Sequence, residues 1–379
     1  MKVYKKSNSF SEFRSNEEQE IIKIKKKITN ALLNFQKIYE NKIDIKKKII
    51  IDKIISEFEN QKNFELFSNV IEEIKKLKFD EDLVQYIINR YKYDVFPSIK
   101  ELDEYPPNVQ IEIASICNFR CIFCYQTDNQ FNKRSGGFMG HMNFEVFKKI
   151  IDELEGNVQF LTLASRGEPL ICKDFNKMIE YTKGKFLGLK INTNASMLTE
   201  DKAKSILESE VCTLVISADA AEEENYSKYR VNGDLNRIVK NLKKFNQIKN
   251  DFYPDSKIIT RVSGVKFDKE QNYKKMKEFW GSMVDQVAFV NYLPWENAYN
   301  SKPNNLNTPC SDLWRRMFIW WDGSVNPCDV DYRSSLKISN VKDETIKEIW
   351  NSKKYNSLRE KHLNNQRQKI NICSKCSLI

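Results

Sequence analysis

Seven of the nine cysteines fall into two groups whose spacing could build metal centres. The first group is a short loop, Cys117-x3-Cys121-x2-Cys124, and the second is spread over Cys310, Cys328, Cys373 and Cys376. Three thiolates can hold a [4Fe–4S] cube and leave one iron open, whereas structural zinc prefers four ligands in a closed shell. Four thiolates can close either a tetrahedral zinc site or a cubane. Spacing alone therefore predicts sulfur-bound metal and leaves the metal open.

Composition limits the other kinds of chemistry. The chain has 379 residues, 41% of them hydrophobic and 30% charged, which is typical of a globular protein. Its only histidines, His141 and His362, leave little room for histidine-based catalysis or metal binding. No apolar run reaches the roughly eighteen residues of a membrane helix, and the N-terminus has no apolar signal-peptide core. We therefore expect a cytoplasmic protein, in which nine cysteines would not form a disulfide framework.

The charge gives little information about partners. The net charge is +10, but the excess is spread along the chain and forms no basic stripe with interleaved aromatics. We expect neither a nucleic acid nor a membrane as partner. Lysine runs such as 25–27 and 46–48 are typical of solvated helix faces.

The chain divides into three regions by its pattern. Residues 1–104 show helical periodicity and contain no glycine, which predicts an accessory helical region. Residues 105–300 alternate short β-branched runs with helical stretches, and the predicted strands are 109–115, 158–164, 187–193, 212–218, 257–263 and 286–292. Six βα units are too few for a closed eight-stranded barrel. We expect an α/β fold with an open, partial (β/α)6 barrel, and a doubly wound sheet remains possible. Residues 301–379 predict a small cluster-binding domain with a hairpin turn at 322–323.

Motifs at successive strand ends identify a family. The three-cysteine loop follows the first predicted strand, and an aromatic residue, Phe123, precedes its last cysteine. Further segments follow the next three strands in order: Gly167-Glu168-Pro169, then Asn192-Thr193-Asn194, then Ser217 and Asp219. Together they resemble the motifs of the radical SAM superfamily, over about residues 108–376. Ligands of such α/β folds bind at the carboxyl ends of the strands, where all four motifs lie.

The resemblance implies a cofactor and a reaction. The open iron would bind the amino and carboxylate groups of S-adenosylmethionine, and reductive cleavage would yield a 5′-deoxyadenosyl radical that takes a hydrogen atom from the substrate. A reductant such as flavodoxin or ferredoxin would supply the electron. The Gly167–Pro169 segment would meet the methionyl amino group, and the backbone at Phe123–Tyr125 would meet the adenine. The resemblance also implies cofactor contacts from the residues Asn192, Asn194, Ser217, Asp219 and Arg230.

The second cysteine group resembles the SPASM/twitch extension of this superfamily. A full SPASM domain has seven cysteines and two auxiliary clusters, whereas four cysteines resemble the shortened twitch form with one auxiliary [4Fe–4S] cluster. The spacing of Cys310, Cys328, Cys373 and Cys376 is similar to that of a dehydrogenase acting on an aminocyclitol ring. The resemblance therefore implies two clusters in all.

Five residues are candidates for contact with the substrate. Arg166 stands where many family members have a second glycine, so it would point toward a substrate or form an ion pair at the barrel rim. Asp329 and Tyr332 flank an auxiliary cysteine, as does Asp331, and one of them could deprotonate a substrate hydroxyl or have a structural role. Cys172 is either a buried packing residue or a hydrogen-atom donor.

These features predict a radical SAM oxidoreductase that dehydrogenates a polar small molecule, sugar-like or cyclitol-like, with help from the auxiliary cluster. Two enzymatic alternatives are peptide modification and sugar epimerisation. A non-catalytic zinc or iron–sulfur sensor is a third alternative, although zinc would not explain the motifs at residues 167–169 and 192–194.

Overall fold

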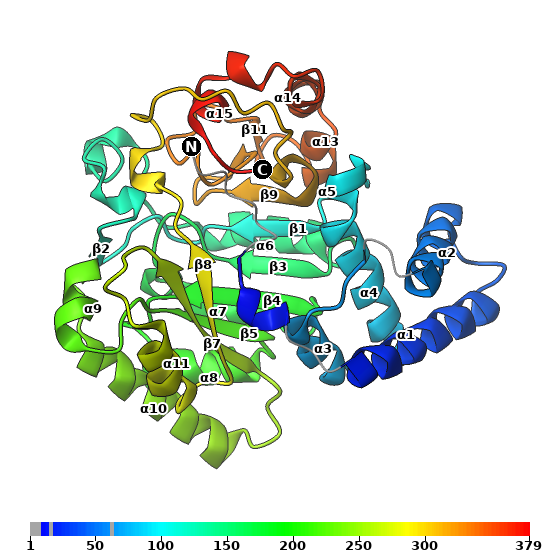
Figure 1. Cartoon of the computed structure of the whole chain (residues 1–379), viewed down its shortest axis with the longest axis horizontal. Helices are drawn as coiled ribbons and strands as arrows, with labels where there is room; N and C mark the ends of the chain where they lie inside the picture. The colour runs from blue at the N-terminus through cyan, green and yellow to red at the C-terminus, as the bar shows by residue number, and fades with distance from the viewer. Residues whose placement is uncertain (1–8, 15–17, 61–63) are drawn as a thin grey trace.

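A nine-stranded sheet forms the centre of the molecule (Figure 1). The computed structural model describes residues 9–14, 18–60 and 64–379. Six of the strands are mutually parallel in the order β1-β3-β4-β5-β7-β8. Their bounds are β1 Asn108–Ile111, β3 Phe160–Leu163, β4 Gly188–Thr193, β5 Thr213–Ser217, β7 Ile259–Lys266 and β8 Gln286–Asn291. The six predicted strands and the open (β/α)6 arrangement are thus confirmed, because β8 does not pair with β1.

Amphipathic helices cover one face of this sheet. They are α6 Phe144–Leu154, α7 Phe175–Tyr181, α8 Glu200–Glu208, α10 Leu235–Phe252 and α11 Tyr273–Gly281. In α10 the buried residues Leu235, Ile238, Leu242 and Phe245 recur at helical spacing and form one apolar stripe. Asn143 and Asp234 cap α6 and α10 by accepting hydrogen bonds from backbone N–H groups of the first turns.

The strands separate apolar from polar residues by their period of two. Leu189 and Ile191 of β4 join the apolar core with the helices, as do Leu214 and Ile216 of β5. Lys190, Asn192, Val215 and Ser217 alternate with them and point to the opposite, concave face. The concave face is therefore rich in polar side chains, as expected of a binding surface and not of a packed core.

The C-terminal region continues the same sheet. Strand β9 (Arg316–Ile319) pairs in parallel with β1, and β10 (Ser324–Asn326) and β11 (Ser339–Asn340) add antiparallel strands beyond it. The predicted turn at 322–323 joins β9 to β10, with Gly323 at φ +85°. The remaining helices of this region are α12 Asp312–Arg315, α13 Ile346–Trp350, α14 Lys353–Leu363 and α15 Asn371–Lys375.

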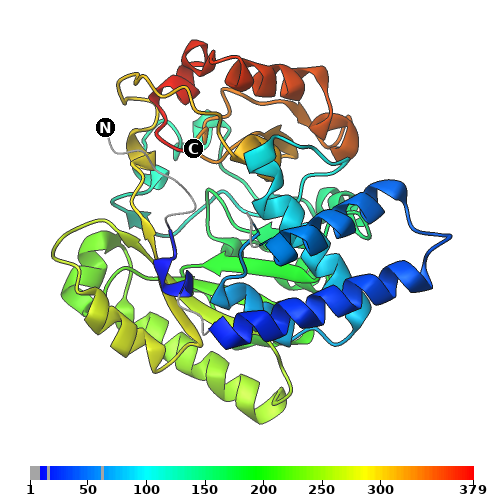
Figure 2. The same ribbon diagram turned by 45° about the vertical axis from the view of Figure 1, so that its right-hand side comes forward.

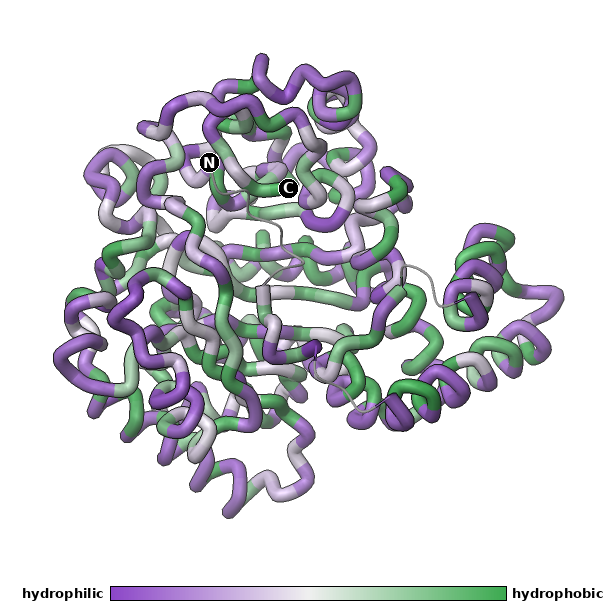
Figure 3. Tube along the Cα trace, in the orientation of Figure 1, coloured by the Kyte–Doolittle hydropathy of each residue, from purple (hydrophilic) through white to green (hydrophobic). Residues whose placement is uncertain are grey.

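The N-terminal region is helical, as predicted. It contains α1 Glu18–Ile38, α2 Ile45–Asn60, α3 Ser68–Lys75, α4 Asp80–Asp94 and α5 Phe96–Ile99. α1 and α2 project from the body of the molecule in both views (Figures 1 and 2), and their turns alternate between hydrophilic and hydrophobic (Figure 3). A separate apolar core joins these helices to Phe160 at the start of β3. Within the described residues, no helix combines the length and apolarity needed to span a bilayer.

Candidate functional site

The three-cysteine loop lies at the carboxyl end of β1 and is held by a short pairing of its own. Strand β2 (Arg120–Cys121) pairs antiparallel with β6 (Arg230–Val231), and the Cys124 N–H donates to the Cys121 carbonyl over 3.0 Å. The Phe119 N–H donates to Cys117 Sγ over 3.4 Å. Burial raises the pKa of the Cys117 thiol to about 12 and raises the pKa of Cys124 further. A metal bound here must displace these protons, because the thiolate is the ligand.

Gly167 lets the turn after β3 approach the cysteine loop closely. A Cβ at this position would lie 2.4 Å from the Ala114 carbonyl oxygen, so no other residue fits without a backbone shift. The Glu168 N–H donates to the Ile116 carbonyl over 2.9 Å, just before the first cysteine. Pro169 then begins the 3₁₀ turn Pro169–Ile171. The predicted motif is thus in contact with the cluster loop.

Glu168 joins two strand ends through its carboxylate. It accepts hydrogen bonds from the Leu170 N–H (3.0 Å), the Thr193 hydroxyl (2.6 Å) and the Asn194 N–H (2.7 Å). Burial raises the pKa of this carboxyl, and the three donors oppose that shift. Its oxygens are engaged by the protein, so Glu168 positions the end of β4 beside the cysteine loop.

Asn194 reaches the first cysteine from β4. Its Nδ2 donates to Asn118 Oδ1 over 3.0 Å and lies 4.0 Å from Cys117 Sγ. Asn192, two residues earlier, has a buried Oδ1 with no hydrogen-bond partner among the described residues. Ser217 stands at the end of β5, half-buried on the same concave face. These three predicted cofactor contacts therefore share one edge of the sheet.

Asp219 and Arg230 connect β5 to the second cysteine. Their side chains form an ion pair of 2.6 Å and are both buried. Arg230 Nη1 also lies 3.7 Å from Cys121 Sγ, and its guanidinium lies 5.9 Å from the centre of the Phe123 ring. Asp219 in turn accepts from the Val265 N–H over 2.6 Å. Arg230 is therefore positioned to stabilise a thiolate at Cys121.

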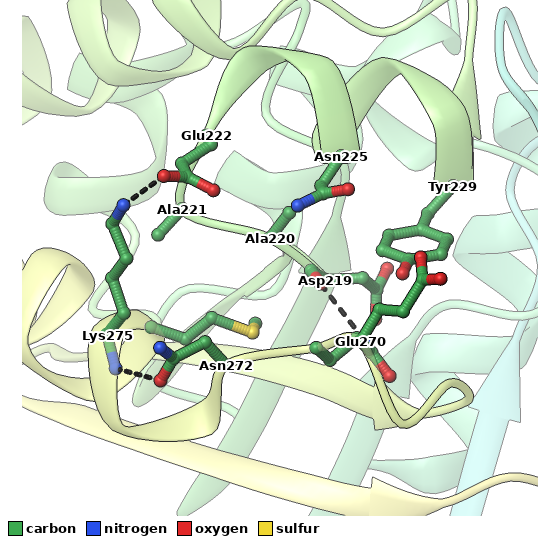
Figure 4. A pocket seen from close by; sticks show the side chains of 11 residues that line it. Asp219, Ala220, Ala221, Glu222, Asn225, Tyr229, Glu270, Asn272 and Lys275 are labelled. Carbon is green, nitrogen blue, oxygen red and sulfur yellow. Dashed lines mark hydrogen bonds and ion pairs between the residues drawn. The ribbon is translucent and has the colours of Figure 1, made fainter.

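A cavity of about 260 Å³ lies beside Asp219, between the first turns of α9 (Glu223–Tyr229) and α11. Figure 4 shows Asp219, Glu222 and Glu270 at its wall, with Lys275 paired to Glu222. Asp219 is the only one of the predicted site residues among those that line it.

The four C-terminal cysteines are partly buried against one apolar cluster. Two residues that we did not predict organise this region. Arg367, which is 1% exposed, donates to the carbonyls of Thr308, Cys373, Cys376 and Leu378 at 2.8–3.2 Å. His362 Nδ1 accepts from the Cys310 N–H over 3.2 Å, and burial lowers the pKa of His362 to about 4. Proximity to Cys373 in sequence was the only signal for Arg367.

The donor sets fit iron–sulfur clusters. No group of three or more His, Cys, Asp or Glu side chains in the described parts of the chain is arranged as it stands to hold a metal ion. In a cubane each thiolate binds a different iron, so the ligands surround the cluster instead of converging on one ion. The close backbone approach at Gly167, where a Cβ would fill the space, suits this edge of the barrel to a polar cofactor.

One apolar cluster contacts both cysteine groups. Its buried members are Tyr125, Phe131, Ala298, Val330, Tyr332, Ile372 and Leu378, and Cys124 and all four C-terminal cysteines pack against it. Tyr125 stacks on Tyr332 with ring centroids 4.9 Å apart, and the Tyr332 hydroxyl donates to Asp128 over 2.7 Å. Burial, together with this hydrogen bond, raises the pKa of Tyr332.

Arg166 forms an ion pair, which is one of the two arrangements that the sequence left open. It makes a buried two-pronged contact with Glu112 at 2.6 and 2.7 Å, and its Nη1 donates to the Tyr332 carbonyl over 2.8 Å. Its guanidinium lies 4.1 Å from the Trp320 ring centre. Arg166 therefore links the barrel to the C-terminal region. The sequence did not indicate Glu112, because no motif near Glu112 showed that Arg166 would be its partner.

Two other candidates also have protein partners. Asp331 accepts hydrogen bonds from the Tyr299 hydroxyl (2.5 Å), from the Ser335 hydroxyl (2.6 Å) and N–H, and from the Leu336 N–H. Its carboxylate therefore stabilises the turn at residues 331–336. Cys172 is 3% exposed within the apolar core, with its sulfur 3.9 Å from the sulfur of Met178. Asp329 is 8% exposed beside Cys328.

An open (β/α)6 barrel with three loop thiols at its carboxyl edge and a four-thiol extension defines the radical SAM class of enzymes. The family description "Radical SAM superfamily" matches residues 111–271, and "Iron-sulfur cluster-binding domain", the SPASM domain, matches residues 310–377. The chain therefore belongs to the radical SAM superfamily and carries a C-terminal SPASM-type domain. These domains imply S-adenosylmethionine and two iron–sulfur clusters as cofactors.

Several known proteins are similar to this chain. The mycofactocin maturase MftC of Mycolicibacterium smegmatis is 27% identical over 44% of this chain, and the aligned part spans 39% of that protein. The tungsten-containing aldehyde ferredoxin oxidoreductase cofactor-modifying protein of Pyrococcus furiosus is 22% identical over 65% of this chain and 81% of its own length. Among solved structures, Streptococcus suis SuiB bound to precursor peptide SuiA has a TM-score of 0.57, 14% identity, and coverage of 89% of this chain and 88% of SuiB. These similarities agree with the fold.

Proposed function

We propose that this radical SAM enzyme dehydrogenates a polar small molecule, sugar-like or cyclitol-like, with the auxiliary cluster as the electron acceptor. The observation that carries the proposal is the apolar cluster around Tyr125 and Tyr332, against which Cys124 of the first site and all four cysteines of the second pack. Four thiolates would close the auxiliary site, so its role would be redox and not substrate ligation. A continuous packed contact between two redox sites suits electron transfer.

The polar concave face supports a polar substrate. Ser217, Ser263 and Asn192 lie there within adjacent rows of the sheet, at the edge where the cofactor motifs lie. The chain's residues would bind the cofactor amino group near Gly167, hold Cys121 through Arg230 and keep water away with the apolar cluster. When bound, the cofactor and clusters would supply removal of one hydrogen atom and one electron from the substrate.

A base must take the hydroxyl proton, and we assign Asp329 to this role. Asp329 is a carboxylate beside Cys328, close enough to Tyr125 to affect its pKa. We expect Asp329→Asn to lose oxidised product by about 10²-fold or more while S-adenosylmethionine cleavage persists. Loss of both activities together would instead indicate a structural role.

The main test removes the auxiliary cluster alone. Reconstituted wild-type protein should hold about eight iron atoms, and the double variant Cys373→Ala/Cys376→Ala about four. With a chemical reductant, in place of flavodoxin or ferredoxin, both should release 5′-deoxyadenosine, but only the wild type should yield oxidised product without uptake of solvent deuterium. Product from the double variant, or deuterium incorporation without net oxidation, would reject the proposed dehydrogenation. The second result would indicate an epimerase.

Peptide modification is the second candidate. It is supported by the similarity of SuiB, which was solved with a precursor peptide, over 89% of this chain, and by the mycofactocin maturase. A small peptide encoded near the gene would then be the substrate. Mass change of such a peptide in the anaerobic assay would favour this function over small-molecule oxidation.

A further inference from the structure

The concave face carries two cations that the cofactor chemistry described above does not use. In the register of the sheet, Asn192 of β4 aligns with Val215 of β5 and then with Arg261 of β7. Lys190 lies one inward position earlier on β4. All of these positions alternate with the apolar residues that face the helices, so they point into the barrel. Asn192 and Arg261 lie one inward row below Ser217 and Ser263, and Lys190 lies two rows below, toward the amino ends of the strands.

Arg261 is buried with an incomplete set of partners. It is 7% exposed, its Nε donates to Gln286 Oε1 over 2.8 Å, and its guanidinium lies 4.7 Å from the Phe13 ring centre. Its Nη2 is buried and has no hydrogen-bond partner among the described residues. A buried, charged donor without an acceptor is costly, so this group is suited to a ligand that supplies one.

Lys190 adds a second cation without a partner. Its ammonium makes no hydrogen bond or ion pair with the described part of the chain. Burial, and then the charges of Arg316 and Arg261, lower the pKa of Lys190 to about 8. Tyr93 and Glu73 face it as well, and Tyr86 and Arg90 also act on Arg261. Glu73 accepts the Tyr86 hydroxyl over 2.5 Å, and Arg90 is paired with Asp94. One carboxylate therefore faces both unpaired cations.

Asn192 completes the group from the other side. Its buried Oδ1 lacks a partner within the described residues, and by strand spacing its backbone lies about 10 Å from that of Arg261, across β5. Asn192 and Arg261 therefore flank Val215 within one row of the sheet. The segment Ser9–Arg14 lies against this region in Figure 1, and the Phe10 N–H donates to the Phe289 carbonyl of β8 over 3.0 Å.

We propose that Lys190, Arg261 and Asn192 form an anion-binding site inside the barrel, which holds a carboxylate or phosphate group of the substrate. Lys190 and Arg261 bind the anionic oxygens, and Asn192 Oδ1 accepts a hydrogen bond from a neighbouring hydroxyl or N–H of the same molecule. The inference rests on the proposed function for its identification of the ligand as substrate, and it restricts that substrate to an acidic one.

Binding of simple anions tests the site without turnover. The probes are inorganic phosphate and acetate, titrated calorimetrically into anaerobic holoprotein saturated with S-adenosylmethionine, so that the cofactor's own carboxylate site is filled. We expect saturable one-to-one binding of at least one anion to the wild type. Binding should weaken roughly tenfold or more in Arg261→Gln and in Lys190→Met. The control Lys274→Met removes a lysine whose side chain is 88% exposed and should bind as the wild type does.

The outcomes separate the site from the reaction. No saturable binding to the wild type, or unchanged affinity in both variants, would overturn the anion site. If Arg261→Gln fails to fold, Arg261→Lys replaces it, because this variant keeps the positive charge. Arg261→Lys should bind the anion more tightly than the double variant Lys190→Met/Arg261→Lys, which has lost one cation. If the anion binds as expected but no acidic compound is oxidised, the anion site stands and the dehydrogenase proposal fails. The preferred probe, phosphate or acetate, identifies the acidic group of the substrate.

Discussion

Buried charges at this site differ mainly in whether the protein supplies their partners. Arg166 and Arg230 have carboxylates, Glu112 and Asp219, at ion-pair distance, and both act as connectors. Lys190, which is half-buried on the concave face, has none. A paired buried charge is costly to break, and an unpaired one is costly to keep.

Lys190 therefore predicts a dependence of stability on pH. Its pKa is about 8 in the folded protein, below the ordinary value of 10.5. Between these values the unfolded chain binds more protons, so stability rises with pH through this window and the full cost is present below pH 8. We expect Lys190→Met to be more stable at pH 7, by on the order of 3 kcal/mol, with the difference vanishing toward pH 10. Urea unfolding at pH 7, 8.5 and 10 measures this, and Lys190→Arg should show no gain. A gain that is equal at all three pH values would contradict the assignment.

At the level of single residues, the sequence predicted the cofactor motifs better than their partners. Gly167, Glu168, Asn194 and Arg230 all lie at the cysteine loop, because each follows a strand whose carboxyl end faces the same edge. Glu112 and Arg261 were missed, since their significance depends on the register between strands distant in sequence. No local pattern specifies that register.

At the level of elements, the turn after β3 is fixed by a steric requirement. Gly167 is the position where a side chain would meet the backbone of residues 114–116. The turn cannot move away from the cysteine loop, because Glu168 forms hydrogen bonds with both Ile116 and the end of β4. The geometry of the cysteine loop therefore depends on this one glycine.

We expect Gly167→Ala to reduce iron bound at the first site and to abolish cofactor binding while leaving the auxiliary site loaded. The matched control is Gly281→Ala at the end of α11, where a Cβ meets nothing within 4 Å. The control should keep both clusters and be neutral or slightly more stable. Iron analysis and binding of S-adenosylmethionine measure both variants. Full iron and normal cofactor binding in Gly167→Ala would show that the turn can shift.

Elements themselves were largely predictable, and their pairing was not. Five of the six barrel strands fall within three residues of their predicted bounds, and β1 ends four residues early, because apolar runs between helical stretches mark the strands clearly. Strand β9 was expected only as part of a hairpin, and its parallel pairing with β1 was not foreseen. Both strands are short and apolar, and such runs carry no information about which edge they join.

At the scale of the whole molecule, the C-terminal region belongs to the barrel structurally. β9 covers the edge of β1, Arg166 reaches Tyr332, and Arg333 forms an ion pair with Asp128 after the cysteine loop. The predicted boundary at residue 300 therefore separates two groups of sequence motifs. It does not divide the sheet, because strands from both sides of it pair with each other.

Truncation after residue 300 should therefore leave an unstable protein. It would expose the edge of β1 and leave the Arg166–Glu112 pair without Trp320. We expect loss of soluble monomer on size-exclusion chromatography. Arg333→Gln removes the ion pair with Asp128 and the other contacts of this guanidinium but leaves β9 in place, so it should remain soluble and serve as the comparison. A soluble, iron-binding fragment of residues 1–300 would contradict the dependence of the barrel on β9.

The pairing of β9 with β1 also bears on how the protein is made. Asn108 in the first barrel strand pairs with Arg316, which leaves the ribosome after every other barrel strand has been synthesised. During that interval one edge of the sheet is open and the three loop thiols adjoin an incomplete structure. Parallel contacts between distant segments form slowly. The loop of Cys117–Cys124 therefore reaches its final surroundings only after β9 has been synthesised, and a cluster inserted earlier would bind to a barrel with one open edge.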